Sequence, residues 1–212
     1  METSNNYKTP QEAFWAGSFG SEYIGRNESS QLLASNLNFF SKALGRVGKL
    51  NSCIELGANI GMNLKALQLL YPGIGLRAVE INPDAAKLLC GVIGEANVYL
   101  GSIFDFPIDK KVELSLIKGV LIHINPEMLS KVYERLYHAS ERFILVCEYY
   151  NPSPVAISYR GHADRLFKRD FAGEMLDKYP DLCLVDYGFS YRHDPAFPQD
   201  DITWFLMEKR SK

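Results

Sequence analysis

The sequence predicts an α/β fold with a mainly parallel sheet and an antiparallel strand pair at one edge. Short apolar runs alternate with helical patterns; the runs cover residues 52–56, 75–81, 97–100, 112–117 and 142–149, and the patterns cover 61–71, 83–94 and 126–140. Strands that alternate with helices pair in parallel through right-handed crossovers. Two further apolar runs, 182–187 and 202–208, are joined by a polar, proline-rich loop, which favours antiparallel pairing. We therefore expect a seven-stranded mixed sheet.

Three more segments have helical patterns. Residues 10–18 and 29–45 precede the first strand, and the second of them begins at Ser29 and ends near Gly45, with a hydroxyl residue as start signal and a glycine as stop signal. The third, near 164–178, follows the fifth strand. A chain of 212 residues fits one domain with such additions.

The composition is that of an ordinary globular protein, with 47% hydrophobic and 23% charged residues. The net charge of −2, without a stripe of Lys and Arg, disfavours a nucleic-acid substrate. No secretion signal and no run of membrane-spanning length is present. The cysteines lack the spacing of a metal or disulfide site, so we expect buried thiols in a cytoplasmic protein; they are Cys53, Cys90, Cys147 and Cys183.

A glycine turn follows the first predicted strand. Gly57 and Gly61 are separated by three residues, with Asn59 between them and Glu55 two positions before the first glycine. Asn tolerates the left-handed conformation that such a turn requires. Glu80 ends the second predicted strand, 19 positions after Gly61 (80 − 61). In a parallel unit that spacing brings the carboxylate beside the turn, where it can accept both hydroxyls of a ribose.

The spacing of the turn also indicates which cofactor is bound. A dinucleotide turn usually has three glycines, and an acid such as Glu55 would repel a pyrophosphate but suits a ligand with an ammonium and a sulfonium group. A phosphate-binding P-loop is excluded because no Gly-Lys-Ser/Thr follows. The pattern E-x-G-x-N-x-G with a later strand-end acid resembles the S-adenosylmethionine site of class I methyltransferases. That resemblance implies a Rossmann-like sandwich, with S-adenosylhomocysteine as the product.

Other segments are candidates for cofactor contacts. Residues 101–105 follow the third strand, where adenine contacts are expected, and residues 118–123 follow the fourth, where the backbone is expected along the cofactor. The aromatic segment 13–27 reads as a lid that keeps water from a sulfonium, although a helix that merely plugs the sheet remains open. The full set of expected cofactor residues is Trp15, Tyr23, Arg26, Glu55, Gly57, Ala58, Asn59, Gly61, Asn63, Glu80, Ile81, Ser102, Ile103, Lys118 and Gly119.

The segment 148–165, rich in Pro, Tyr and basic residues, is expected to form the acceptor pocket. Its local positive charge suits an anionic, hydroxylated molecule, whereas pairing of those charges on the surface is the alternative. Expected substrate contacts are Tyr150, Asn151, Tyr159, Arg160 and Arg165. Methyl transfer is expected to proceed in line, with a base only if the acceptor keeps its proton. Candidates for this base or its orienter are His123, Glu148, Tyr149 and His162, and His123 is equally consistent with a packed histidine.

Several motifs together are similar to those of the pseudaminic acid biosynthesis-associated methylases. They are the segments 14–24, 55–63, 118–126, 148–154, 159–162 and 198–204. This resemblance covers nearly the whole chain and implies methylation of a hydroxyl or amino group on a small, sugar-derived acceptor of nonulosonic-acid or surface-glycan pathways.

The expected organisation is a single methyltransferase domain. It comprises a helical lid (1–48), a cofactor-binding core (49–150), a substrate-loop insertion with a helix (151–180) and a C-terminal β-hairpin (181–212). Two other readings stay open: a non-catalytic S-adenosylmethionine-binding regulator, and an NAD-dependent nucleotide-sugar oxidoreductase or epimerase. The sequence predicts no metal site and leaves the oligomeric state open.

Overall fold

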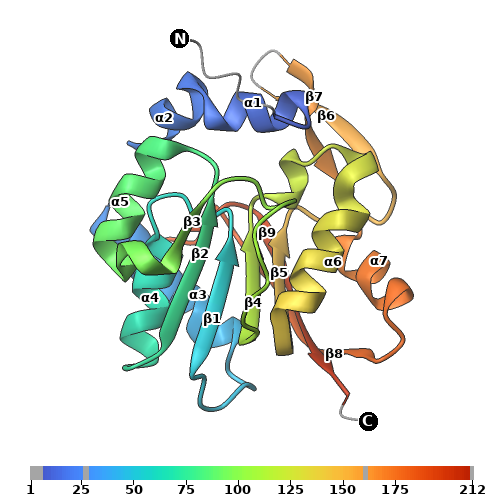
Figure 1. Cartoon of the computed structure of the whole chain (residues 1–212). Coiled ribbons are helices and arrows are strands. Elements are labelled where there is room, and N and C mark those ends of the chain that lie inside the picture. Colours follow the sequence, from blue (N-terminus) through green and yellow to red (C-terminus); the bar gives the residue numbers. More distant parts are fainter. Residues whose placement is uncertain (1–6, 26–28, 160–161, 211–212) are drawn as a thin grey trace.

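The computed structural model describes residues 7–25, 29–159 and 162–210 and is built around one mixed sheet (Figure 1). The sheet has seven strands in the order β3-β2-β1-β4-β5-β9-β8. Neighbours among the first five pair in parallel, whereas β9 pairs antiparallel with both β5 and β8. Their bounds are β1 Ser52–Leu56, β2 Gly75–Glu80, β3 Val98–Leu100, β4 Val112–Lys118, β5 Ser140–Glu148, β8 Leu182–Ser190 and β9 Ile202–Lys209. The sheet predicted from the sequence is confirmed.

Helices cover both faces of the sheet. One face is covered by α3 (Ser30–Ala43), α4 (Met62–Leu70) and α5 (Pro83–Ile93), and the other by α6 (Leu129–Ala139) and α7 (Phe171–Lys178). Side chains of β5 alternate between the faces: Leu145 and Cys147 pack toward α3 and α4, and Ile144 and Val146 toward α6 and α7. The apolar runs are continuous because parallel strands are buried on both sides.

Short 3₁₀ helices connect several of these elements. They are η1 (Glu95–Asn97), η2 (Leu121–His123) and η3 (Pro126–Met128). The cysteines are free, with Cys53 and Cys147 buried and Cys90 and Cys183 partly buried. Within the described ranges, no helix combines the length and apolarity needed to cross a membrane, and no three His, Cys, Asp or Glu residues are grouped to hold a metal ion.

Two segments differ from the sequence-based expectation. The helix expected at 10–18 is α1 (Pro10–Ala16), which ends because Gly17 is extended, with φ −89° and ψ −160°, and a further short helix that was not expected, α2 (Ser18–Ile24), follows it. The helix expected from about residue 164 begins at Phe171, where Asp170 accepts a hydrogen bond from the Gly173 N–H at 2.8 Å. Residues before it form β7 (His162–Lys168), which pairs antiparallel with β6 (Val155–Tyr159). Pairing with the neighbouring strand outweighs the local helix preference of this segment.

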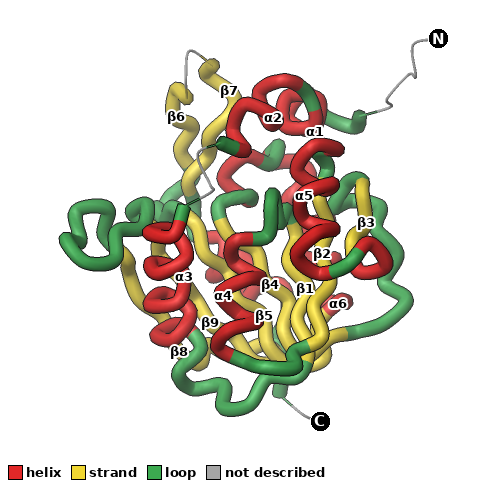
Figure 2. The backbone as a smooth tube through the Cα atoms, turned by 90° about the vertical axis from the view of Figure 1, so that its left-hand side faces the viewer, coloured by secondary structure: helices red, strands yellow, loops and turns green. Residues whose placement is uncertain are grey.

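Helices α1 and α2 and the β6–β7 pair lie over the carboxyl ends of the parallel strands, and Figures 1 and 2 show this from two sides. In an open α/β sheet, ligands bind in the crevice outside these strand ends. The two additions therefore cover the edge at which the predicted site residues meet.

Candidate functional site

A cavity of about 690 Å³ opens at the carboxyl edge of the sheet. The glycine turn, the ends of β2 and β4, the two N-terminal helices and the loop between β8 and β9 all contribute to its lining. Its volume lies within the range of small-molecule and cofactor pockets. The cavity therefore draws its lining from segments that are far apart in the sequence.

The glycine turn has the backbone geometry that its sequence predicts. Gly57, Asn59 and Gly61 have φ values of +79°, +48° and +82°, so the prediction of a left-handed Asn59 is confirmed. A Cβ on Gly57 would lie 2.6 Å from Val120 Cγ2, and one on Gly61 would lie 2.7 Å from Leu89 Cδ1. Glycine is required at both positions because neither the conformation nor the space accepts a side chain.

Glu80 ends β2 beside this turn and lines the cavity. Its Oε2 accepts a hydrogen bond from the Asn59 N–H at 2.7 Å, and its Oε1 accepts one from the Asn82 N–H at 2.8 Å. Burial raises the pKa of this carboxyl, and hydrogen bonds from the backbone oppose the rise. Each carboxylate oxygen has a second acceptor site, so Glu80 can also accept hydrogen bonds from a ligand.

Glu55 lies beneath the cavity and does not line it. Its Oε1 accepts a hydrogen bond from Asn63 Nδ2 at 2.6 Å, and Asn63 itself lines the cavity. Burial raises the pKa of Glu55 to about 8, against the lowering effects of Asn63 and Lys118. The structure thus differs from the predicted direct contact: Glu55 fixes Asn63, and Asn63 faces the ligand space.

His123 ends η2 and has a defined tautomer. Its Nδ1 lies 2.6 Å from the backbone carbonyl oxygen of Arg165 in β7, and since a carbonyl only accepts, Nδ1 must carry the proton and donate it. Nε2 is then the nitrogen that can accept a proton. The ring packs between Trp15 and Tyr159, with centroid distances of 4.7 and 5.2 Å. Packing and a role as a base are therefore compatible in this residue.

We expect the stability of the protein to depend on His123 at acid pH. Burial lowers its pKa from 6.5 to about 4, so between these values the unfolded chain takes up a proton that the folded chain does not. The contribution of His123 to the free energy of unfolding is fully present above pH 6.5 and is lost as the pH falls to about 4. The loss amounts to up to about 3 kcal/mol. Urea unfolding from pH 4 to 7 should show this dependence of the free energy of unfolding on pH in the wild type and not in H123N. An equal pH dependence in both proteins would contradict the lowered pKa of His123.

Glu148, at the end of β5, is buried, and the structure does not bring it to the cavity as a base. Its Oε1 accepts hydrogen bonds from the N–H groups of Val120 (2.9 Å) and Leu121 (2.8 Å). Its Oε2 accepts one from Ile122 at 3.5 Å. Burial raises its pKa to about 7, although these three bonds lower it. Glu148 therefore holds the turn that presents His123.

Tyr149 lines the cavity, and burial raises the pKa of its hydroxyl, with further increases from Asp200 and Tyr23. At neutral pH the group keeps its proton, so it suits a hydrogen-bond donor better than a base. The Lys168 ammonium lies 5.0 Å from the centre of its ring.

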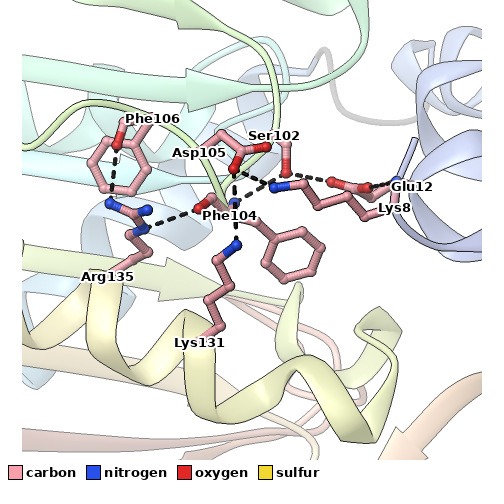
Figure 3. A network of polar contacts seen from close by, with 8 residues as sticks. All are labelled: Lys8, Glu12, Ser102, Phe104, Asp105, Phe106, Lys131 and Arg135. Atoms are coloured by element: carbon pink, nitrogen blue, oxygen red, sulfur yellow. Dashed lines mark hydrogen bonds and ion pairs between the residues drawn. The ribbon is translucent and has the colours of Figure 1, made fainter. Parts of the chain in front are cut away.

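The end of the cavity near β3 is joined to α1 by polar contacts (Figure 3). The Ser102 hydroxyl donates a hydrogen bond to Glu12 Oε1, and Lys8 Nζ forms an ion pair with Asp105. Glu12 Oε2 accepts a hydrogen bond from the Lys8 N–H at 2.6 Å. Glu12 lines the cavity and is 7% exposed. Helix α1 therefore adds a carboxylate at the position where the sequence predicted only Ser102 and Ile103.

Asn82 connects the N-terminal helices to the sheet. Its Oδ1 accepts hydrogen bonds from the N–H groups of Asp84 and Ala85 at 3.0 Å and thereby caps α5. Its Nδ2 donates to the carbonyl oxygens of Trp15 (3.2 Å) and Gly17 (3.3 Å). One side chain thus begins α5 and holds the junction of α1 and α2.

We expect Asn82→Ala to destabilise the protein by more than the loss of a helix cap alone, which costs about 1 kcal/mol. Amide hydrogen exchange in residues 10–24 should accelerate because the contacts to Trp15 and Gly17 are lost. Ser29→Ala is the matched control, since Ser29 caps α3 through the Leu32 N–H at 3.0 Å but, among the described residues, has no side-chain hydrogen bond to α1 or α2. Unchanged exchange in N82A would show that α1 and α2 are held by other contacts.

Aromatic side chains form the roof of the cavity. Trp15 packs edge-on against Phe19 and Tyr23, with centroids 5.3 and 5.4 Å apart, and Phe19 contacts Tyr159 of β6 at 6.4 Å. The indole Nε1 of Trp15 is buried and has no hydrogen-bond partner among the described residues. A buried N–H without a partner is costly, so this donor is available to a bound ligand.

The cavity brings together most of the predicted site residues. Those that line it are Trp15, Tyr23, Gly57, Ala58, Asn59, Asn63, Glu80, Ile81, Ile103, Lys118, Gly119, His123, Tyr149 and Tyr159. Gly61 and Ser102 do not line the cavity: Gly61 precedes the first residue of α4, and the Ser102 hydroxyl donates a hydrogen bond to Glu12, which does line it. Arg26 and Arg160 lie outside the described residues, as does the side chain of His162.

Three predicted substrate residues do not line the cavity. Tyr150 is 43% exposed, with its ring 5.9 Å from that of Phe205, and Asn151 donates a hydrogen bond to the Ser153 carbonyl at 2.5 Å. The Arg165 guanidinium lies 5.5 Å from the Phe14 ring centroid, so its contact with the site is the carbonyl that holds His123. Tyr150 and Asn151 lie in the connection between β5 and β6, and Arg165 lies in β7.

Several residues that line the cavity are not among the site residues expected individually from the sequence. They are Gln11, Glu12 and Gly20 of the N-terminal helices, Leu32 and Asn36 of α3, Ile60, Met62, Asn82, Ala85, Val120 and Ile124, and Arg192, Pro198, Gln199, Asp200 and Ile202 near β9. The polar run 198–201 before the last strand is the sequence feature that could have indicated a role of the β8–β9 loop in the site. Asn36 is 1% exposed and accepts a hydrogen bond from Gln199 Nε2 at 2.8 Å, which fixes this loop to α3.

Solved methyltransferases share this architecture. The 1,6-didemethyltoxoflavin N1-methyltransferase of Burkholderia thailandensis, with 1,6-didemethyltoxoflavin and S-adenosylhomocysteine bound, has a TM-score of 0.71 at 18% identity over 97% of this chain and 92% of its own. The magnesium protoporphyrin IX methyltransferase of Synechocystis with bound S-adenosylmethionine has a TM-score of 0.66 at 13% identity, over 97% of this chain and 100% of its own. A glycopeptide N-methyltransferase complexed with S-adenosylmethionine has a TM-score of 0.61 at 14% identity, over 84% of this chain and 94% of its own.

These likenesses establish the class I methyltransferase fold. No family model matches the sequence, and neither does any curated protein.

Proposed function

We propose that the protein is an S-adenosylmethionine-dependent methyltransferase whose cofactor and acceptor meet in the cavity at the carboxyl edge. The observation that carries this proposal is the junction of the left-handed turn at Gly57–Gly61 with Glu80, which lie side by side and are linked by the bond from Asn59. The fold shared with methyltransferases that hold S-adenosylmethionine or its product supports it.

In this proposal the cofactor extends across the strand ends. The adenine lies beside Ser102 and Ile103 after β3, the ribose hydroxyls donate to Glu80 at the end of β2, and the methionine part lies along the turn at Gly57 and beside Asn63 and Lys118. Trp15 and Tyr23 cover the sulfonium, since aromatic faces stabilise a cation at modest desolvation cost. The helices α1 and α2 are then a lid over the bound cofactor.

The reaction is an in-line displacement. A lone pair on an acceptor oxygen or nitrogen attacks the methyl carbon, the carbon–sulfur bond breaks, and its electron pair stays on sulfur, which yields S-adenosylhomocysteine. His123 Nε2 takes the proton that the acceptor loses, and the resulting imidazolium is stabilised by its bond to the Arg165 carbonyl. The low pKa of His123 keeps the ring unprotonated at neutral pH. Holding both partners in line supplies most of the acceleration.

Calorimetric titration tests the choice of cofactor. We expect S-adenosylhomocysteine to bind with micromolar affinity and NAD to give no heat of binding. Binding of NAD without binding of S-adenosylhomocysteine would overturn the proposal in favour of a dinucleotide enzyme.

We propose further that the acceptor is a small, anionic, sugar-derived molecule methylated on a hydroxyl or amino group. The resemblance to methylases of nonulosonic-acid pathways supports this, and the cationic side chain of Arg192, which lines the cavity, suits an acceptor carboxylate. The methyltransferases of the same fold act on unlike acceptors, among them 1,6-didemethyltoxoflavin and a glycopeptide, so the acceptor depends on the residues around the cavity.

Mass spectrometry of nonulosonic acids tests this acceptor. Cells that produce the wild-type protein should contain a methylated species that is absent from cells producing an inactive variant. A methylated product of another chemical class would contradict the sugar acceptor and leave the cofactor assignment standing.

A further inference from the structure

Helix α1 supplies a carboxylate to the end of the cavity beside β3. Glu12 is buried, lines the cavity and accepts a hydrogen bond from the hydroxyl of Ser102, the second residue after β3. The two residues are 90 positions apart in the sequence. Helix α1 is thereby joined to the strand end that it covers, as Figure 3 shows.

Ser102 is occupied by contacts within the protein. Its Oγ accepts a hydrogen bond from the Phe104 N–H at 3.0 Å, and its own proton is directed at Glu12. Glu12 also accepts the Lys8 N–H at 2.6 Å. A carboxylate has about four acceptor sites, so Glu12 retains two for a ligand whereas the hydroxyl proton of Ser102 is already used.

The other acid nearby is engaged elsewhere. Asp105 forms an ion pair with Lys8 and lies 3.9 Å from Lys131 Nζ, its side chain is 46% exposed, and it is not among the described residues that line the cavity. The pair with Lys8 anchors the start of α1 to the segment after β3, and the contact with Lys131 joins that segment to α6. Thr9 caps the helix by accepting the Glu12 N–H at 3.2 Å, so the backbone of Glu12 is fixed as well.

The position of Glu12 selects for one group of the ligand. Under the proposed function the ribose binds Glu80, and the Gly101 N–H donates to the Glu80 carbonyl at 2.8 Å, so the base attached to the ribose reaches the residues that follow Gly101. The edge of adenine carries acceptor nitrogens and a single donor group, the 6-amino group. A carboxylate complements only that donor, because ring nitrogens with lone pairs repel it.

We propose that Glu12 accepts a hydrogen bond from the 6-amino group of adenine, so that α1 determines the selectivity for the base of the cofactor. This inference rests on the proposed function. It implies that a base with an oxygen at position 6 is rejected, since two acceptors would face each other. It also implies that bound adenine holds α1 against the end of β3.

The test compares the binding of S-adenosylhomocysteine with that of S-inosylhomocysteine, in which the 6-amino group is an oxygen. By calorimetry we expect the wild-type protein to prefer the adenosyl compound about 10- to 100-fold, as for hydrogen bonds to a charged group. Glu12→Gln should reduce this preference to near unity, because an amide both donates and accepts. Glu22→Gln, which removes an exposed acid of α2, should keep the wild-type preference.

A second variant separates loss of the acid from damage to the fold. In E12Q/S102D a carboxylate is placed directly after β3, and the preference for the adenosyl compound should return. Wild-type protein that binds both compounds equally, or E12Q that keeps the wild-type preference, would overturn the inference while leaving the proposed function intact. Wild-type protein that binds neither compound would overturn the proposed function and the inference together.

Discussion

His123→Asn is expected to lower the rate of methyl transfer by about 10²- to 10⁴-fold, the usual contribution of a general base. Asparagine can still donate a hydrogen bond toward the Arg165 carbonyl, which His123 Nδ1 meets at 2.6 Å, but it offers no basic nitrogen. The affinity for S-adenosylhomocysteine should stay within about threefold of wild type, because binding and proton transfer depend on different residues. Initial rates of S-adenosylhomocysteine formation with the acceptor measure the effect.

The pH profile separates a base from a packing residue. The unprotonated ring is the active form, so wild-type activity should persist below pH 6.5 and fall only toward the pKa of about 4. The activity of H123N should not show this decrease toward pH 4. His138→Asn, which changes an exposed histidine of α6, should leave both rate and profile unchanged. A rate for H123N within about twofold of wild type would mean that His123 only packs between Trp15 and Tyr159.

Glu80→Gln is expected to weaken the binding of S-adenosylhomocysteine about 10- to 100-fold, the cost of losing a hydrogen bond to a charged acceptor. The new amide nitrogen would face a backbone N–H of Asn59 or Asn82, both of which donate to Glu80. The glycine turn would therefore lose a hydrogen bond at the same time as the ribose. Calorimetry measures the affinity, and thermal unfolding measures the effect on the fold.

Glu113→Gln is a matched control for this variant. Glu113 lies near the start of β4, at the opposite edge of the sheet, and accepts hydrogen bonds from the Asn51 N–H (2.6 Å) and Asn51 Nδ2 (2.9 Å). E113Q should lower stability in a similar manner and leave the affinity for S-adenosylhomocysteine unchanged. Equal affinity in E80Q and wild type would refute the placement of the ribose.

The strands and their directions were predictable from the sequence because apolar runs and turns are local signals. The turn at Gly57, Asn59 and Gly61 was predictable for the same reason, since left-handed conformations restrict the residue type. Glu80 followed from its distance to Gly61, as the length of one helix and one strand fixes where a parallel neighbour ends.

Residues from distant segments were not predictable in this way. Glu12 meets Ser102, and Asn82 Nδ2 meets Trp15 and Gly17, only when α1 packs across the strand ends, and nothing in the neighbouring sequence records that packing. The part of β7 from about residue 164 was expected as a helix because its pairing with β6 depends on a contact across the hairpin. Glu148 has the residue type of a base, but its burial under η2 makes it a support for the turn before His123.

Transfer of an isotopically labelled methyl group from S-adenosylmethionine is the most direct test of the central claim. The protein would be incubated with labelled cofactor and the small-molecule fraction of a bacterial extract that contains nonulosonic acids. We predict that wild-type protein forms S-adenosylhomocysteine and a labelled acidic small molecule, whereas E80Q and H123N form far less of both. Tight binding of the cofactor without any transfer of label would contradict the claim and favour a regulator that only binds S-adenosylmethionine.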